Sequence, residues 1–436
     1  MPTLPPSHEL REPLYNEVHA RPYEPVTAPE EVSYVAVTGP ANVRAAERRH
    51  LGELCSSYQL PPPPESANHY RADFGPLRLK WERHSEFSGY KFYRRVADNA
   101  PFSISALDLL PERWLARLPG ELVVRAHIWV SSAETAPLDL KSIESYFAGD
   151  FLIGGGIAGG AGDAYTDLRL QADGAIRFLV VNREMGPHQA GRLVQRLLEI
   201  EIYRMMALLA FPFAQALGDR LTVIERELAR VTVAVSSSEG EKDSDLLNEL
   251  TRLAAEVESS VAAGSFRLSA TRAYYAIVTQ RISELREVRI PGVQTFAEFM
   301  SRRFSPAMST CESVASRHEA LSRRVARASE LLRTRVEVTR EQQNQKLLAS
   351  LDQRQRLQLR LQATLEVFSI AAITYYVVGL VIYATKGIKA AGVDVDIDIV
   401  AGISIPVVAI LVAIGVHRIR RMVSRQVPHD EGDWSP

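Results

Sequence analysis

The residue types that could carry out acid–base chemistry gather in two short groups. Each group combines a carboxylate, a histidine and an arginine: Glu17, His19 and Arg21 near the start of the chain, and Arg83, His84 and Glu86 at the end of a predicted strand. A histidine beside a carboxylate can transfer protons near neutral pH. The alternative is that these side chains form salt bridges or cap an element.

Other signatures of catalysis are scarce. Gly154–Gly159 matches the pattern G-x-G-x-x-G, but a predicted strand follows it, and not the helix whose N-terminus would hold a phosphate. We interpret these glycines as a bulged or flexible connection within a sheet. The sequence has no Walker lysine motif and no G-x-S-x-G motif. Cys55 and Cys311 lack the spacing of a zinc site. We therefore expect no enzyme activity, no metal and no cofactor.

A third group of polar and small residues lies in an apolar segment near the C-terminus. Ser369, Tyr376 and Tyr383 recur at intervals of seven residues, and Ala372 and Gly379 lie beside them on the same predicted helix face. Polar side chains within a membrane usually contact protein or a water-filled path. Small residues let helices approach closely. If several copies surrounded an axis, this polar stripe would line a pore. Alternatively, Tyr383 lies at the membrane interface and Ser369 bonds its own backbone.

The polar stripe belongs to a long predicted helix. Residues 307–378 contain no glycine or proline, and a helix of that length would extend roughly 100 Å. The helix is rich in Arg, Gln and Glu up to residue 366, whereas Val367–Ala384 is apolar. A second apolar segment follows at Ile399–Val416. Each is long enough to cross the hydrocarbon core of a bilayer. We expect a stalk that enters a membrane and ends in a two-span hairpin.

Charges around the two spans predict their orientation. Basic residues occupy both outer flanks: Lys346, Arg354, Arg356 and Arg360 before the first span, and Arg418, Arg420, Arg421 and Arg425 after the second. The two lysines of the connecting loop are offset by three aspartates: Lys386 and Lys389, with Asp394, Asp396 and Asp398. The positive-inside rule then places both termini in the cytoplasm and the loop outside the inner membrane.

The preceding part of the chain is predicted to be a cytosolic body. Residues 1–186 alternate strand-like and helical segments, which indicates an α/β or α+β domain with a mixed sheet. Leu77–His84 alternates apolar and polar residues, as a half-buried strand does. Residues 187–305 are predicted to form a long helical hairpin, whose first helix is kinked at Pro212. We assign residues 306–366 to the stalk helix, 367–416 to the membrane hairpin and 417–436 to a basic cytosolic tail.

The stalk and the overall charge indicate the partners. Val314, Val325, Val336 and Leu347 recur every eleven residues and form an apolar seam, which is typical of packed helices. We therefore expect a homo-oligomer in a lipid bilayer. The 51 basic residues balance the 52 acidic ones, so the chain lacks the basic excess of a general nucleic-acid binder.

Three strings resemble a known family. Asn16–Pro22 (NEVHARP), Thr166–Gly174 (TDLRLQADG) and Gly191–Ala210 (GRLVQRLLEIEIYRMMALLA) are similar to predicted membrane-anchored bacterial proteins grouped under domain of unknown function 3422. The resemblance extends along nearly the whole chain. It implies membrane anchoring but no defined activity.

The layout also resembles the CorA magnesium channel superfamily. That superfamily has a cytosolic α/β domain, a helical hairpin, a very long helix that continues into the first span, and a basic C-terminus. The resemblance implies a pentamer whose first span lines a pore. The Gly-Met-Asn filter of that superfamily is absent, since no asparagine follows Asn344.

Together these features predict an oligomeric membrane protein that passes or senses a small ion and is gated by its cytosolic domain through the stalk. The alternative is a membrane-anchored cytosolic scaffold or sensor whose spans only tether it.

Overall fold

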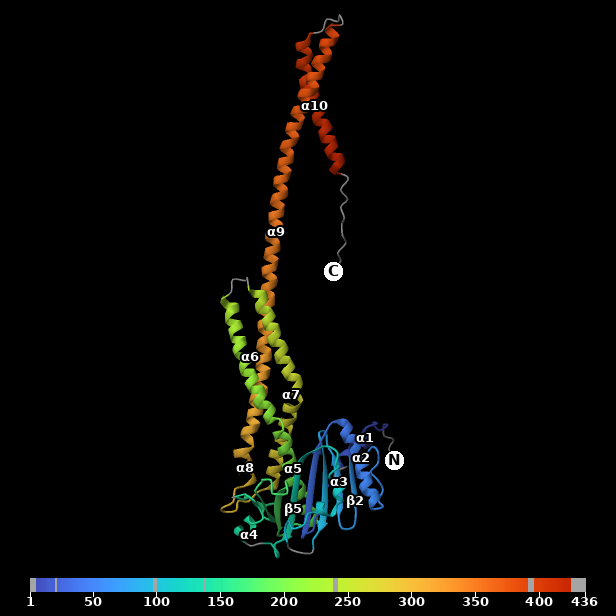
Figure 1. Cartoon of the computed structure of the whole chain (residues 1–436), viewed down its shortest axis with the longest axis vertical. Coiled ribbons are helices and arrows are strands. Elements are labelled where there is room, and N and C mark those ends of the chain that lie inside the picture. The colour runs from blue at the N-terminus through green and yellow to red at the C-terminus, as the bar shows by residue number, and fades with distance from the viewer. Residues whose placement is uncertain are drawn as a thin grey trace. The chain divides into compact units, whose positions relative to one another are not determined.

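The computed structural model describes residues 5–19, 22–96, 100–136, 139–149, 151–237, 242–390 and 396–424. The chain divides into two compact units, Met1–Leu331 and Leu332–Pro436. Figure 1 shows the mixed sheet and the helices that follow it in the chain. These elements confirm the predicted α/β N-terminal domain followed by helices.

The first unit is built around an eight-stranded sheet with the order β2-β3-β4-β1-β5-β8-β7-β6. The strands are β1 Glu30–Thr38, β2 His69–Asp73, β3 Arg78–Arg83, β4 Phe87–Arg95, β5 Glu121–Ser132, β6 Ile153–Ile157, β7 Gly162–Thr166 and β8 Ile176–Asn182. Strands β5 and β8 pair in parallel, and the other neighbouring pairs are antiparallel. The sheet is therefore mixed, as the sequence predicts.

The glycine-rich segment forms strand β6. A Cβ added at Gly154 would lie 2.0 Å from the carbonyl oxygen of Ala164 on β7, so only glycine fits this close approach of two backbones. Gly156 also exchanges backbone hydrogen bonds with Val288, which lies just after the helix that ends at Leu285. The glycines thus serve contacts between backbones within the sheet and at its edge.

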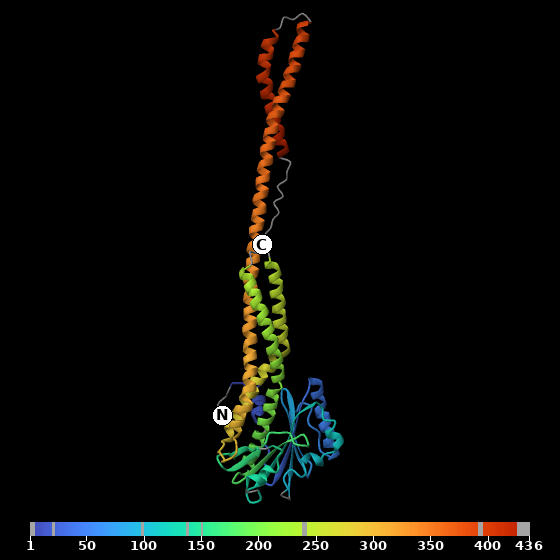
Figure 2. The ribbon, with the colours of Figure 1, turned by 60° about the vertical axis from the view of Figure 1, so that its left-hand side comes forward.

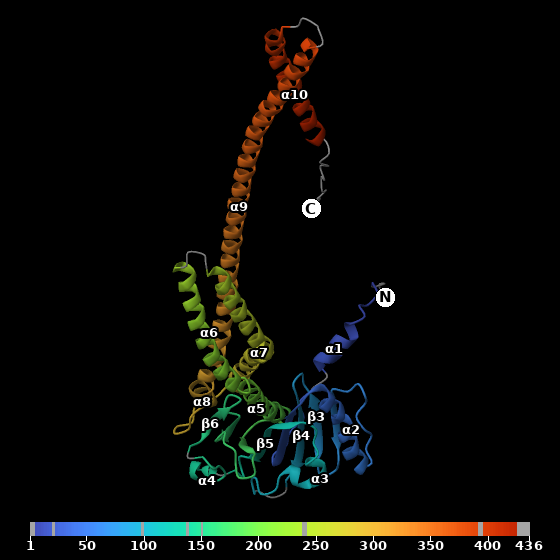
Figure 3. The same ribbon diagram turned by 45° about the horizontal axis from the view of Figure 1, so that its top comes forward.

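Helices cover both faces of the sheet. On one face, α2 (Ala41–Ser57), η1 (Ala106–Leu109) and α3 (Glu112–Leu115) enclose an apolar cluster with Trp81, Tyr90 and Phe92. A second apolar cluster around Trp129 and Leu179 includes side chains of α4 (Leu140–Glu144). Helix α5 (Pro187–Leu208) packs against β5 (Figure 3). Helix α1 (Arg11–His19) precedes the sheet in the chain.

The helix after the sheet is interrupted rather than kinked. Helix α5 ends at Leu208 and α6 (Phe211–Ser237) starts anew, so the prediction of one helix bent at Pro212 is wrong at this point. Proline has no N–H to donate to the carbonyl of Leu208, four residues earlier, and its ring clashes with that carbonyl. Pro212 instead takes a place in the first turn of α6, where no N–H is needed.

A three-helix bundle completes the first unit. Helix α6 pairs with α7 (Asp243–Leu285), and α8 (Phe296–Arg303) leads to α9 (Ser305–Ala390). Figure 2 shows α6, α7 and the first part of α9 side by side. Arg317 of α9 contacts Glu225 of α6 at 2.9 Å, and Arg272 of α7 contacts Glu312 of α9 at 2.7 Å.

The apolar seam of α9 divides at about residue 332. Val314, Leu321 and Val325 are buried within the first unit, whereas Leu347 is exposed. The first half of the seam therefore packs inside one chain. Only positions after it are open to another copy.

The second unit contains the end of α9 and α10 (Ile397–Ser424), which lie together in Figure 1. Each of these two helices has a stretch that is long and apolar enough to cross a membrane. These stretches are almost wholly unburied within the chain. Such exposed apolar surface requires lipid or protein around it. Of the basic tail, Arg425 lies outside the described residues, as do residues 391–395 of the loop between the spans.

Candidate functional site

The first predicted acid–base group is described only in part. Glu17 and His19 form the end of α1, but the positions of their side chains lie outside what the structure describes, and so does all of Arg21.

The second predicted group lies at the turn between β3 and β4. Arg83 ends β3, and its Nε and a terminal nitrogen both donate to the same oxygen, Oε2 of the buried Glu47 on α2, at 3.2 and 3.1 Å. The hydroxyl of Ser88, opposite Arg83 in the hairpin, also donates to this oxygen, at 2.8 Å. The guanidinium is thus held by a buried carboxylate at the end of β3.

Glu86 contacts a different element. It accepts a hydrogen bond from the phenol of Tyr274 and pairs with Arg267 at 2.9 Å, and both partners lie on α7. Burial, followed by the hydrogen bond to Glu86, raises the pKa of Tyr274 above its ordinary value. Tyr274 therefore stays protonated and acts as a hydrogen-bond donor. These contacts join the β3–β4 turn to the helical bundle.

Aromatic rings connect the turn with α5 and α7. The ring of His84 stacks on Phe87 with centroids 4.4 Å apart. Tyr203 of α5 meets the edge of Phe87 at 5.8 Å and stacks on Tyr274 at 5.5 Å. A cavity of about 350 Å³ opens between these groups. It is lined by Asn68, Arg83, His84, Ser85, Phe87, Tyr203, Tyr274 and Ile277.

This hairpin cavity has the features of a binding site for a small polar or aromatic ligand. Its walls combine aromatic faces with an imidazole, an amide, a hydroxyl and phenols, a composition common in ligand pockets. Two of the three predicted residues line it, while Glu86, in the same β3–β4 turn, positions Tyr274. In the part of the chain that the structure describes, no group of three His, Cys, Asp or Glu residues is arranged to hold a metal ion.

The polar stripe lies on the last part of α9. Tyr376 and Tyr383 are 73% and 74% exposed, Ser369 and Ala372 are also exposed, and Gly379 is partly exposed. By contrast, Val378 and Thr385 are buried within the second unit. A cavity of about 660 Å³ adjoins this face and is bounded by Ile405 of α10. The stripe is therefore not covered by the second span of the same chain.

Comparison with known proteins decides the family. A family profile described as "Protein of unknown function (DUF3422)" matches residues 6–423. The chain belongs to the DUF3422 family. This confirms the resemblance carried by the three sequence strings. No curated protein and no solved structure matches the chain.

Sequence reasoning missed part of the site in this DUF3422 chain. Tyr203 and Tyr274 are separated by about seventy residues and stack on each other only in the fold, where Tyr203 also meets Phe87. In the sequence each resembles any other aromatic residue on a helix.

The polar residues of β3 are also placed differently from their prediction. The alternation in Leu77–His84 predicts that Lys80 and Glu82 are exposed to solvent, but both are buried. Because this sheet is covered on both faces, the polar residues of the strand form an ion-pair network with Lys91 instead.

Proposed function

We propose that this DUF3422 member is an oligomeric membrane protein that passes or senses a small ion. Several copies of α9 would surround the path, and the cytosolic sheet domain would gate it through this helix. This layout is similar to that of the CorA superfamily. If the assembly is also CorA-like, it is a pentamer. The Gly-Met-Asn filter is missing, so other groups must contact the ion.

The observation that carries this proposal is the uncovered polar stripe. Tyr376 and Tyr383 present phenol groups on a helix that is apolar enough to lie in lipid, and α10 does not cover them. Lipid cannot satisfy these hydroxyls, so a protein neighbour or water is the better partner. A second copy of the chain would be such a protein neighbour. Several copies would also enclose a water path, which two spans alone cannot do.

The proposed orientation places both termini in the cytoplasm of a cell with an inner membrane. Support comes from the basic residues that flank the spans, such as Arg360 and Arg418, and from Asp396 and Asp398 at the start of α10. The bilayer is then one partner and further copies of the chain are the other. With no excess of basic residues, nucleic acid is not a proposed partner.

The continuity of α9 supports the gating element. The helix is unbroken from Ser305 to Ala390, so it leaves the bundle of the first unit and includes the polar stripe of the second. In the proposed function, a change in the first unit would reach the stripe along this one helix.

Substituting one tyrosine of the stripe tests the proposal. We expect Tyr376→Ala to change ion flux into reconstituted vesicles by about tenfold, which corresponds to a barrier change of about 1.4 kcal/mol. Phe368→Ala is the control, because Phe368 is an aromatic residue of the same span and is 74% exposed, but lies off the stripe. Flux is measured with ion-sensitive dyes for monovalent and divalent cations.

Two results would contradict an ion path along the stripe. One is wild-type protein that shows no flux for any of the tested ions. The other is an equal effect of Phe368→Ala and Tyr376→Ala, since that would reflect general damage to the helix. Ser369→Leu provides a second test, because it removes a hydroxyl one repeat away on the same face.

The second candidate function is a membrane-anchored scaffold or sensor without transport. The hairpin cavity favours it, because a site formed by the turn of β3–β4, α5 and α7 could report ligand binding to the bundle. In that function the spans serve as a tether, and an unrelated membrane span can replace them without loss of function. An anchored enzyme is not proposed.

A further inference from the structure

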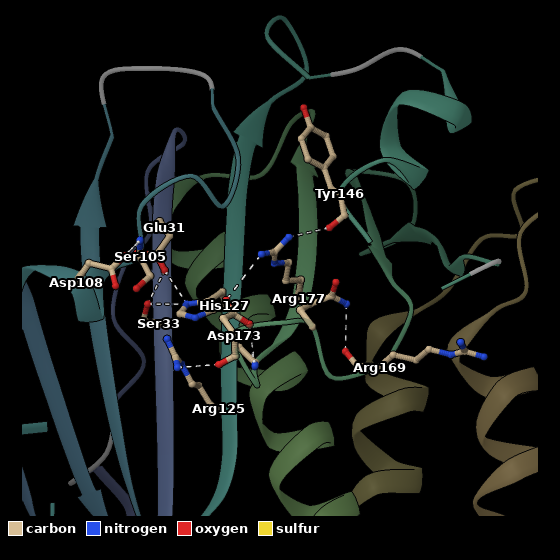
Figure 4. A network of polar contacts seen from close by, with 12 residues as sticks. Glu31, Ser33, Ser105, Asp108, Arg125, His127, Tyr146, Arg169, Asp173 and Arg177 are labelled. Atoms are coloured by element: carbon tan, nitrogen blue, oxygen red, sulfur yellow. Dashed lines mark hydrogen bonds and ion pairs between the residues drawn. The ribbon is translucent and has the colours of Figure 1, made fainter. Parts of the chain in front are cut away.

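A polar cluster lies on the sheet face between the two apolar clusters. Ser33 of β1 is directly opposite His127 of β5, which in turn is opposite Arg177 of β8. One row along the strands, Glu31 of β1 is opposite Arg94 of β4. Neighbouring strands are about 4.8 Å apart, so these side chains lie close together. Figure 4 shows Glu31, Ser33, His127 and Arg177, which come from β1, β5 and β8.

His127 is held on one side of its ring only. Ser33 donates to Glu31 at 2.6 Å, and Nδ1 of His127 is 2.8 Å from the hydroxyl of Ser33 and 3.3 Å from Glu31. Glu31 also accepts from the backbone N–H of Ala106 at 2.7 Å. Because the serine and the glutamate both contact Nδ1, this is not the relay of a serine hydrolase, in which they contact opposite nitrogens. The Nε2 atom is buried and has no partner among the described residues.

Three arginines around this histidine are held by carbonyl groups. Arg94 donates to the carbonyl of Ile104 at 2.5 Å, Arg125 to that of Asp173 at 2.9 Å, and Arg177 to that of Tyr146 at 3.1 Å. The Nε atom of each arginine is buried and lacks a hydrogen-bond partner in the described part of the chain. The carbonyls orient the guanidinium groups without neutralising them.

The carboxylates of the cluster compensate only part of the positive charge of these three arginines. Glu31 lies 3.8 Å from Arg94 and Asp173 lies 3.7 Å from Arg177, so neither pair is at hydrogen-bond distance. Three guanidinium groups thus face two carboxylates, and Glu31 is already bonded by Ser33 and Ala106. A buried donor without a partner costs about 1–3 kcal/mol. Several such donors at one place indicate a missing acceptor.

We infer that this cluster binds a small oxyanion of the size and charge of phosphate. Guanidinium groups bind oxyanions with paired, charge-assisted hydrogen bonds, and the arginine side chains here are fixed before binding. Arg177 remains 24% exposed, so the cluster can be reached from solvent. Asp173 lies in the string Thr166–Gly174, which is one of those that resemble the family. The site is separate from the hairpin cavity and from the polar stripe.

Phosphate titration of the full chain in detergent tests this inference. Inorganic phosphate is added at constant ionic strength, with chloride as the balancing anion, and binding is measured by calorimetry. We expect saturable binding that becomes about tenfold weaker or more in Arg125→Gln and Arg177→Gln, since each loses a charge-assisted bond. Arg169→Gln is the matched control, because Arg169 is a nearby surface arginine that lies over Phe151 and not in the cluster.

A second measurement keeps the test independent of folding. Line broadening of the phosphorus resonance of phosphate by the wild-type protein needs no variant, and Arg125→Lys keeps the charge while removing the Nε donor. Absence of broadening and of heat in the wild type would overturn the inference. Equal phosphate affinity in the wild type and in folded Arg125→Gln would overturn it as well, because ordered water would then be the missing acceptor.

Discussion

Glu82→Gln is expected to lower the free energy of unfolding of the sheet domain by about 3–5 kcal/mol, because it leaves two buried ammonium groups without an anion. Glu82 lies between Lys80 at 2.8 Å and Lys91 at 2.6 Å, and all three side chains are buried. An uncompensated charge in such a place is much more costly than a lost hydrogen bond between neutral groups.

Tryptophan fluorescence during denaturation of the detergent-solubilised chain measures this effect. Trp81, Trp114 and Trp129 are all buried in the sheet domain, so the signal reports its unfolding. The control replaces Lys80, Glu82 and Lys91 together by methionine, which removes every charge and keeps the side chains of similar size. We expect the control to be much closer to wild type than Glu82→Gln. An unfolding free energy of Glu82→Gln within about 1 kcal/mol of wild type would contradict this account.

The same network predicts a dependence of stability on pH. Burial alone would raise the pKa of Glu82, but Lys91 and Lys80 outweigh burial and lower this pKa from 4.5 to about 2. A carboxylate with a lowered pKa stabilises the fold above its unfolded pKa, and the stabilisation is lost as pH falls. This stabilisation should be lost as the pH falls from about 4.5 to about 2. The triple methionine variant should show no such loss.

Gly191→Ala is expected to destabilise the first unit by about 1–3 kcal/mol through overpacking. A Cβ at this position on α5 would lie 1.9 Å from the carbonyl oxygen of Glu24 and 3.3 Å from the Cα of Pro25. The backbone of this segment cannot move away easily, because the N–H of Val26 donates to the carbonyl of Pro187 at 3.0 Å and the carboxylate of Glu24 pairs with Arg71 at 2.6 Å.

Gly186→Ala is the control for this substitution. Gly186 precedes α5 with a φ of −69°, and an added Cβ there meets nothing within 4 Å. Thermal denaturation followed by circular dichroism should show a clearly lower melting temperature for Gly191→Ala and almost no change for Gly186→Ala. Equal melting temperatures for the two variants would mean that the segment before β1 is not held against α5.

Elements whose pattern repeats along the chain could be predicted from the sequence. Residues 307–378 lack glycine and proline, and α9 covers all of them. Val367–Ala384 and Ile399–Val416 are apolar throughout, and both lie in helices apolar enough to cross a membrane. Local composition is enough here, because the hydrogen bonds of a helix join residues close in sequence.

Contacts between distant segments could not be predicted in this way. The alternation around Lys80 cannot reveal that helices cover both faces of the sheet, and therefore the buried ion pairs were missed. His127 gave no signal, since Ser33 and Glu31 are nearly one hundred residues away in the chain. Arg83 and His84 were singled out because they lie together in the sequence. Tyr203 and Tyr274 line the same cavity but have no neighbouring residue in the sequence that indicates a site.

In the proposed function, several copies of α9 come together around the stripe of Ser369, Tyr376 and Tyr383. The most direct test is the mass of the full chain in lipid nanodiscs, measured by light scattering with the lipid contribution subtracted. We expect a single homo-oligomeric species, with five copies if the assembly is CorA-like. A mass equal to one chain of 48.5 kDa would contradict it, because two spans cannot enclose a path for an ion.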